Sequence, residues 1–314
     1  MIYRFLGRKK FWWLLISGLI MLPGVVSLFV WKLPLGIDFR GGGAAEWQFN
    51  QPISEDELRD TLANQGQLKG VTVSRAGENS VFVKFLPAEV GEYQASLTGV
   101  REKFGEVTEV KFENVGPSVS QDLTRKAIIA VIVASLFILL YLAYSFRGVS
   151  YPVSSWRFGT VALIALLHDL VISVGAFSIL AHFFGYEVDS SFITALLTIM
   201  GFSVHDTIVV FDRIRENLAH KPVESAEEFE KIADDSLSQT LNRSIGTSLT
   251  VIFTLTALLL LGGESIRAFV VTMLVGITVG TYSSIFTATP ILTLWQQRVY
   301  HRSNSGQKGT NTRR

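Results

Sequence analysis

The sequence predicts an α-helical integral membrane protein with six transmembrane helices and one α+β domain outside the membrane. Three observations predict this class. Several apolar runs reach about 20 residues, the length that a helix needs to cross the hydrocarbon core. One long polar stretch, residues 36–125, separates the first of these runs from the other five. Lysine and arginine gather at one end of the runs, which orients them in a membrane.

The composition excludes several classes of function. The chain has 314 residues, of which 48% are hydrophobic, and its mean hydropathy is +0.36. A formal net charge of +1 argues against a nucleic-acid partner, because such a partner needs a basic domain or stripe. The absence of cysteine excludes disulfides, thiolate chemistry and cysteine-ligated metals.

The first predicted span is residues 11–31, which follow a short cytoplasmic N-terminus, residues 1–10. Trp12, Trp13 and Trp31 lie at the two ends of this run, as is typical of interfacial aromatic belts. A basic start before an apolar run also describes a signal peptide, but this run is too long and no small-residue cleavage site follows it. The basic residues before the run place the N-terminus in the cytoplasm.

The polar stretch 36–125 is interpreted as a folded domain on the outer side of the membrane. It opens with a glycine-rich hinge, GIDFRGGG, which lacks the Lys-Ser/Thr ending of a phosphate loop. The order strand, helix, strand, strand, helix, strand is that of the ferredoxin-like βαββαβ fold. With about 90 residues the domain can bury its own core. The six expected elements are residues 44–49, 54–65, 71–74, 80–86, 90–104 and 107–112.

Five further spans follow the domain. Residues 182–190 contain no lysine or arginine, and residues 262–267 contain one basic residue, Arg267. The opposite ends carry most of the positive charge, so the positive-inside rule predicts that both termini are cytoplasmic. The predicted spans are residues 127–144, 158–181, 192–211, 245–261 and 268–294, with an acidic, partly helical cytoplasmic loop at 212–241 and a cytoplasmic tail at 295–314.

Asp206 is an acidic residue inside the fourth predicted span. A charge at the bilayer centre costs about 2.5–3.5 kcal/mol on insertion scales, so an acid at this position favours a functional role. Ser203 shares a helical face with Asp206, and His205 comes directly before it. In the alternative, a protonated Asp206 only hydrogen-bonds to a neighbouring helix.

Polar stripes also mark the fifth and sixth spans. Each stripe alone is compatible with ordinary helix packing, and the G-x-x-x-G of the sixth span lets another backbone come close. Arg243 can reach inward towards Asp206, or its side chain can extend to the membrane interface. The stripes are Arg243, Thr247, Thr250 and Thr254 on the fifth span, and Thr272, Gly276, Gly280, Ser283 and Thr287 on the sixth.

The third span contains His168 and Asp169 near its middle. Two His-Asp dipeptides in one membrane domain invite a metal interpretation. Adjacent side chains lie about 100° apart on a helix, so each dipeptide offers one good ligand, and no H-E-x-x-H motif is present. No metal site is expected. His168 and Asp169 are interpreted as a polar anchor between helices, with proton transfer as an alternative.

Several motifs together resemble the SecD/SecF family of bacterial protein-export membrane proteins, which belongs to the resistance-nodulation-division (RND) superfamily. The resemblance covers the chain up to about residue 294, and the fourth-span motif is long and specific. Arg243 with Thr247 and Ser248 matches the fifth span of the family. The other motifs are GIDFRGG at 36–42, VGP at 115–117, LHD at 167–169, GFSVHDTIVVFDRIREN at 201–217 and GITVGTYSS at 276–284.

The resemblance implies half of a twelve-span RND-type bundle in the bacterial inner membrane, with SecD as the other half and a periplasmic outer domain. It implies an accessory subunit of the Sec export machinery. With SecD, such a subunit uses the proton motive force to drive periplasmic-domain movements that promote late translocation of preproteins through SecYEG. Further implied partners are YajC, YidC, the unfolded preprotein and membrane lipids. Protons are the coupling ion, no other cofactor is implied, and no enzyme activity is expected.

By the same resemblance, Asp206 corresponds to the proton-carrying acid and Arg243 to its partner arginine. Ser203, His205 and Thr247 complete the predicted proton pathway. His205 departs from the asparagine that is common in the family, so the pH dependence does not carry over. Two other functions remain. A small-molecule exporter of the same superfamily would need twelve spans and larger outer loops. A membrane-embedded hydrolase would need a serine–histidine arrangement or a zinc motif, and neither is recognisable in the sequence.

Overall fold

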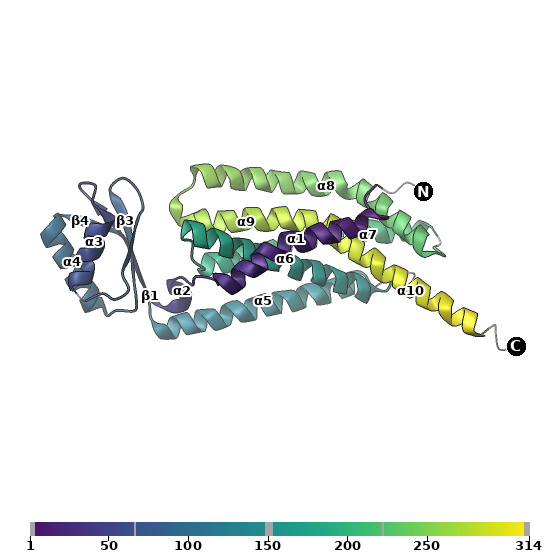
Figure 1. Cartoon of the computed structure of the whole chain (residues 1–314), viewed down its shortest axis with the longest axis horizontal. Helices are drawn as coiled ribbons and strands as arrows, with labels where there is room; N and C mark the ends of the chain where they lie inside the picture. Colours follow the sequence, from purple (N-terminus) through teal and green to yellow (C-terminus); the bar gives the residue numbers. More distant parts are fainter. Residues whose placement is uncertain (1–3, 66, 148–152, 222, 311–314) are drawn as a thin grey trace. The chain divides into compact units, whose positions relative to one another are not determined.

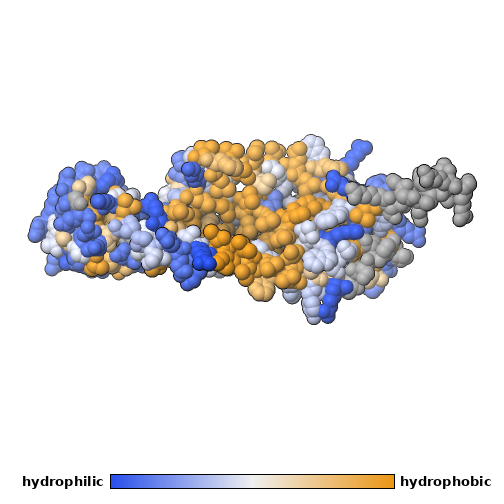
Figure 2. All heavy atoms as spheres, turned by 90° about the horizontal axis from the view of Figure 1, so that it is seen from below, coloured by the Kyte–Doolittle hydropathy of each residue, from blue (hydrophilic) through white to orange (hydrophobic). Residues whose placement is uncertain are grey.

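The computed structural model describes residues 4–65, 67–147, 153–221 and 223–310. The chain divides into two compact units. The helical unit comprises Met1–Leu33, Ala130–Tyr186 and Ser191–Arg314, and the outer unit comprises Pro34–Ile129 and Glu187–Ser190. Figure 1 shows the long helices of the first unit and the sheet with its two helices in the second. Hydrophobic residues dominate the visible surface of the long helices in Figure 2, and hydrophilic residues dominate that of the sheet domain.

Six predicted spans are confirmed, since six helical segments of the described chain are long and apolar enough to cross a membrane. The sixth is interrupted by a π-helical turn, η1. The residues 212–241, predicted as a partly helical loop, are largely helical, because α7 and α8 both extend beyond their apolar parts. The segments are α1 (Lys9–Val30), α5 (Pro117–Ser145), α6 (Ser155–Phe184), α7 (Ser190–His220), α8 (Ala226–Leu261), and α9 (Glu264–Ser283) with η1 (Ser284–Ala288) and α10 (Thr289–Thr310).

Helices α1 and α6 pack along a stripe of small residues. A Cβ atom added to Gly175 would lie 2.6 Å from Cα of Gly24, so the two backbones touch directly. One turn further on, Ser27 donates a hydrogen bond of 2.7 Å to the hydroxyl of Ser178. Apolar surface gains little from packing within lipid, so close backbone contact and interhelical hydrogen bonds hold this pair together.

The predicted role of the G-x-x-x-G motif in the sixth span is confirmed. A Cβ atom on Gly276 would lie 2.2 Å from the side chain of Ile199, and one on Gly280 would lie 3.1 Å from Cβ of Ser203. These two glycines therefore let α9 approach α7. The approach brings hydroxyl-bearing residues of both helices into the interior of the bundle, where the site described below lies.

The outer unit has the predicted ferredoxin-like topology. Its four strands form one sheet in the order β2-β3-β1-β4, and all neighbouring strands are antiparallel. Strands β1 and β4 are longer than predicted because they pair to their ends, with Gly42 opposite Val115. The elements are α2 (Ile37–Arg40), β1 (Gly42–Phe49), α3 (Glu55–Gln65), β2 (Thr72–Arg75), β3 (Ser80–Phe85), α4 (Val90–Phe104) and β4 (Val107–Val115).

A separate hydrophobic core fills the outer unit. Trp47, Phe85 and Tyr93 are almost completely buried in it. The Trp47 indole donates a hydrogen bond of 3.0 Å to the Tyr93 hydroxyl, which in turn donates to Glu109. These bonds satisfy the polar ends of two aromatic side chains whose rings fill the core. The outer unit therefore has the core that an independently folding domain requires.

Candidate functional site

Four acidic residues of the described helical unit are buried, and two of them, Asp169 and Asp206, lie within predicted spans. Asp169 on α6 is 0% exposed, and Asp206 on α7 is 7% exposed. A buried carboxylate needs hydrogen-bond donors around it, because the loss of hydration is otherwise uncompensated. Asp169 and Asp206 differ in the number of donors around the carboxylate, and we therefore expect different roles for them.

Asp169 is surrounded by donors from three helical segments. Its Oδ2 atom accepts hydrogen bonds from the hydroxyls of Ser203 on α7, at 2.5 Å, and Ser283 on α9, at 2.6 Å. Its Oδ1 atom lies 2.9 Å from Nδ1 of His168. Three donors hold this carboxylate in place, so Asp169 ties α6, α7 and α9 together. This geometry agrees with the predicted polar anchor.

The hydrogen-bonded chain continues from His168 to α1 and to the π-helical turn. Nε2 of His168 lies 2.5 Å from the Ser17 hydroxyl, which lies 3.1 Å from the hydroxyl of Thr287 in η1. Sequence reasoning found no serine–histidine arrangement, and the structure corrects this, because Ser17, His168 and Asp169 stand in the order of a hydrolytic triad.

The triad-like order does not make a hydrolase site. Ser17 is only 3% exposed, so a substrate cannot reach its hydroxyl. It also lies inside α1, where backbone N–H groups are engaged in intrahelical hydrogen bonds. Such a position supplies no donors for an oxyanion hole. The chain from Ser17 to Asp169 is therefore a set of interhelical hydrogen bonds.

Asp206 has a sparser and more adjustable environment. The Ser248 hydroxyl on α8 lies 3.2 Å from Oδ2 of Asp206 and 3.0 Å from the carbonyl of Ser244. Thr281 on α9 donates a hydrogen bond of 2.6 Å to Ser248. A hydroxyl carries one proton, so Ser248 can donate to an ionised Asp206. When Asp206 is protonated, the carboxyl can donate to Ser248, and Ser248 can donate to the Ser244 carbonyl. Ser248 can therefore hydrogen-bond to Asp206 in both protonation states.

The predicted proton-pathway residues fall into two groups. Asp206 and Ser203 lie inside the bundle, although Ser203 contacts Asp169 and not Asp206. His205, Arg243 and Thr247 have exposed side chains in this chain. Within the described residues, no ion pair joins Arg243 to Asp206.

Ser248, which belongs to the fifth-span motif, contacts Asp206 from α8, and this contact was not predicted. The signal in the sequence is that Ser244 and Ser248 lie four residues apart, on a face roughly 100° around the helix from the stripe that begins at Arg243. The buried positions in this part of α8 are Leu237, Thr240, Ser244, Ser248 and Leu255.

A second polar cluster, also missed, fastens the start of the chain to α8. Lys10 and Glu230 form an ion pair of 2.7 Å with side chains that are 5% and 6% exposed. Gln297 donates to the other oxygen of Glu230 at 2.7 Å. Asp234 accepts the backbone N–H groups of residues 4–6 at 2.7 to 2.8 Å. This cluster joins α1, α8 and α10, and it pairs the buried charges of Lys10 and Glu230.

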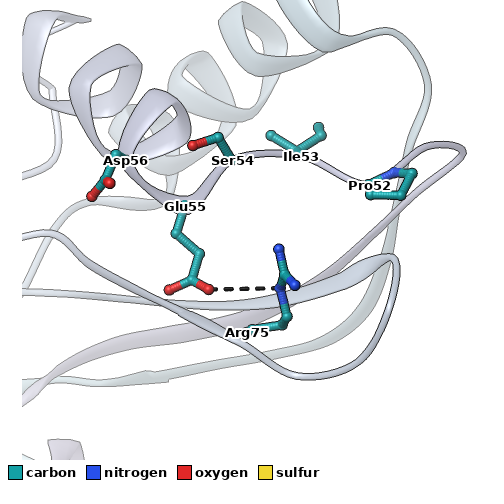
Figure 3. A pocket seen from close by; sticks show the side chains of 6 residues that line it. All are labelled: Pro52, Ile53, Ser54, Glu55, Asp56 and Arg75. Carbon is teal, nitrogen blue, oxygen red and sulfur yellow. Dashed lines mark ion pairs between the residues drawn. The ribbon is translucent and has the colours of Figure 1, made fainter.

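Two further features of the described residues concern a metal or a ligand site. Among the described residues, no three histidine, aspartate or glutamate side chains are grouped to hold a metal ion. Figure 3 shows a pocket of about 500 Å³ on the outer unit, lined by residues 52–56 and Arg75. Its Glu55–Arg75 ion pair, at 3.6 Å, is solvent-exposed and offers no convergent donors for a ligand.

Comparison with known proteins assigns the chain to a family. Residues 95–298 match the family model described as protein export membrane protein SecD/SecF, C-terminal. The protein translocase subunit SecF of Thermobaculum terrenum is 42% identical, over 94% of this chain and 95% of the relative. That of Alicyclobacillus acidocaldarius is 36% identical, over 96% of each chain.

Two solved structures are also similar. A crystal structure of SecDF, a translocon-associated membrane protein from Thermus thermophilus, matches with a TM-score of 0.76 and 32% identity over 90% of this chain. A second SecDF crystal structure, in a super-membrane-facing form, matches with a TM-score of 0.63 and 33% identity over 95% of this chain. The chain spans 37% and 39% of the lengths of these two SecDF chains.

Proposed function

The chain belongs to the SecD/SecF family of protein-export membrane proteins, and on this premise we propose that it is a proton-driven subunit of the Sec export machinery. In this proposal it works with SecD. Proton passage through the helical unit drives movements of the outer domain that promote late translocation of preproteins through SecYEG. The main support is the environment of Asp206, a buried acid whose hydroxyl neighbours suit both of its protonation states.

The surroundings of Asp206 also favour access by water. The hydroxyl of Ser244, one turn before Ser248 on α8, is buried and has no hydrogen-bond partner within the described part of the chain. Buried polar atoms of this kind are usually satisfied by ordered water. A water at Ser244 would extend the hydrogen bonds of Asp206 along α8 towards Arg243, the residue before Ser244. This supports a proton route along α8.

SecD is the proposed partner for the polar residues that this chain leaves exposed. His205, Arg243 and Thr247 have exposed side chains on predicted spans. Polar side chains on membrane helices normally face a protein interior or a wet cavity, since exposure to lipid is costly. The chain covers 37% of a matching SecDF chain, so a SecD-type half is available to cover this face. Arg243 would then lie at the contact between the two halves.

The remaining partners and the orientation follow from the same proposal. SecYEG is the channel, YajC and YidC are further partners, and the unfolded preprotein is the substrate. Both termini are cytoplasmic and the outer domain is periplasmic, because the basic residues gather at one end of the spans. Cysteines at Ser80 and Ser225 test this orientation in intact cells treated with an impermeant thiol reagent. Labelling is expected at Ser80, and labelling only at Ser225 would contradict it.

The energy available is sufficient for the proposed movement. One proton crossing the membrane contributes about 2.3 kcal/mol per 100 mV of membrane potential. A difference of about 1.4 kcal/mol changes an equilibrium tenfold. One proton at 100 mV can therefore reverse the preference between two conformations that differ by about 2 kcal/mol. Directional motion requires only that proton loading at Asp206 favours one of them.

The test is a comparison of precursor export with and without a proton gradient. Inverted membrane vesicles that contain the chain with SecD and SecYEG should export a precursor faster when the gradient is present. An uncoupler should remove this stimulation. The same vesicles without the chain should show little stimulation. Equal export with and without the chain, at equal gradient, would contradict the proposal.

A further inference from the structure

The connection between α6 and α7 is hydrogen-bonded to the first residues of the outer unit. The backbone N–H of Val188 donates to the carbonyl of Pro34 at 2.8 Å, and Gly36 donates back to Val188 at 2.8 Å. Leu35 and Val188 form a parallel bridge. Residues 34–38 and 187–190, here called the Asp38 junction, are thus held side by side although about 150 residues separate them in sequence.

Asp38 binds the first residue of α7 within this junction. Its Oδ2 atom accepts hydrogen bonds from the backbone N–H of Ser190, at 2.8 Å, and from the Ser190 hydroxyl, at 2.5 Å. The first N–H groups of a helix have no partner within the helix, and the helix dipole favours a negative charge at this end. The carboxylate that occupies this position on α7 comes from the glycine-rich segment before β1.

Two more features support a permanent connection. Lys84 on β3 forms an ion pair of 2.9 Å with Glu187, which ties the sheet to the same connection. A Cβ atom on Gly36 would lie 2.9 Å from the Val188 carbonyl, so any side chain at residue 36 would push the two segments apart. Residues Glu187–Ser190 also group with the outer unit and not with the helical unit.

We propose that the Asp38 junction is a fixed mechanical link, in which Asp38 is the positioning residue that joins the outer domain to α7. The inference rests on the proposed function. Because Ser190 is the first residue of α7, a displacement of the junction displaces the start of this helix. Asp206 lies about 24 Å further along the helix axis, at 1.5 Å per residue. A helix is stiff along its axis, so motion at either end reaches the other.

The first test separates linkage from proton passage. In vesicles containing the full chain, SecD and SecYEG, Asp38→Ala should lower gradient-stimulated export at least fivefold. Proton flux through the reconstituted complex should stay within twofold of wild type, because Asp206 and its neighbours are untouched. Asp56→Ala is the matched control. Asp56 also lies in the first turn of a helix in the outer domain, but its ion pair is with Arg59 of the same helix.

The outcomes of this test are decisive. Loss of stimulated export with retained proton flux supports the link. Unchanged export in Asp38→Ala overturns it, and so does loss of both export and flux, since Asp38 would then act on folding or on the proton route itself. An Asp206→Asn variant in the same assay separates this inference from the proposed function. If Asp206→Asn also keeps stimulated export, the proposed function itself fails.

The second test asks whether the junction stays closed during the cycle. The chain contains no cysteine, so Lys84→Cys with Glu187→Cys introduces one unique pair at the ion-paired positions. Joining this pair with a short bis-thiol reagent should leave at least half of the stimulated export, because a fixed link need not open. The two single-cysteine variants, treated alike, are the controls. Loss of export on cross-linking that is absent from these controls overturns the proposal.

Discussion

Ser203 on α7 donates a hydrogen bond of 2.5 Å to Oδ2 of Asp169 on α6. The sequence places Ser203 on the face of Asp206, and its hydroxyl nevertheless serves the other acid. Asp169 is therefore held by donors from three helical segments. Asp206 has a single hydroxyl neighbour on α8, and its hydrogen bonding can change with its protonation state. These environments lead to different expectations for the two acids.

Replacement of Asp169 should destabilise the protein more than replacement of Asp206. Asp169→Ala leaves Ser203, Ser283 and His168 without their acceptor. Hydrogen bonds between membrane helices contribute about 0.6 kcal/mol each, so the two lost interhelical bonds cost roughly 1.2 kcal/mol, and the lost contact with His168 adds to this cost. Asp206→Asn should cost less than about 1 kcal/mol, since one bond is affected. Thermal unfolding of the purified complex in detergent measures both. Equal losses of stability in Asp169→Ala and Asp206→Asn would contradict the different roles of the two acids.

The contact between Gly24 and Gly175 should tolerate no side chain. In Gly175→Ala, the new methyl group would meet backbone atoms of α1 at 2.6 and 2.7 Å, so the helices must move apart. Overpacking of this kind costs about 1–3 kcal/mol. Gly18→Ala is the control, because nothing lies within 4 Å of its Cβ position. Unfolding in detergent should show a loss only for Gly175→Ala, and a similar loss in both variants would refute the packing argument.

Removal of one partner of the buried Lys10–Glu230 ion pair should destabilise the protein. Lys10→Met leaves Glu230 without its cation in a site that is 6% exposed, and removal of one partner of a buried pair costs about 3–5 kcal/mol. Lys9→Met is the control, since the Lys9 side chain is exposed. Adding Glu230→Gln to Lys10→Met should recover most of the loss. A double variant as unstable as Lys10→Met would argue against a charge effect.

Tyr93 should make the stability of the outer domain depend on alkaline pH. Burial, and then the hydrogen bond to Glu109, raise the pKa of Tyr93 above its usual value of 10.0. The folded state therefore holds this proton more tightly than the unfolded state. The contribution to the free energy of unfolding is complete below about pH 10 and is lost as the pH rises through the folded-state pKa.

The measurement uses a soluble fragment of residues 38–118, which contains the whole sheet and one tyrosine. Its hydrophobic core predicts a cooperative unfolding transition with both helix and strand signals in circular dichroism. Urea unfolding between pH 8 and 12 should show stability falling above pH 10, more steeply than in Tyr93→Phe. Identical pH dependence in both proteins would contradict the assignment, and absence of cooperative unfolding would contradict an independent domain.

Much of the fold could be predicted from the sequence because its signals are local. Apolar runs of bilayer length located the spans, and strand patterns with helix signals located the four strands and the helices α3 and α4 of the outer domain, but not the short helix α2. The ends were less predictable. Helices α7 and α8 continue well beyond their apolar parts, since a polar sequence with good helix formers extends a helix once the bilayer has nucleated it.

The candidate site was only partly predictable because its contacts are distant in sequence. Asp206 stood out as an acid within an apolar run, which is a local signal. The contact between Ser17 and His168 joins residues 151 positions apart, and no local pattern relates them. Arg243 and Thr247 are exposed in this chain. Their exposure depends on which face of α8 packs against α7, and periodicity alone does not distinguish the two faces.

The central claim is that Asp206 carries the coupling proton, and one substitution tests it most directly. Asp206→Asn keeps the shape of the side chain and can still accept from Ser248, but it cannot ionise. Precursor export into inverted vesicles, at equal amounts of assembled complex, should lose its stimulation by the proton gradient, while Asp206→Glu should retain part of it. Wild-type stimulation in Asp206→Asn that an uncoupler still abolishes would contradict the account and remove Asp206 from the proton path.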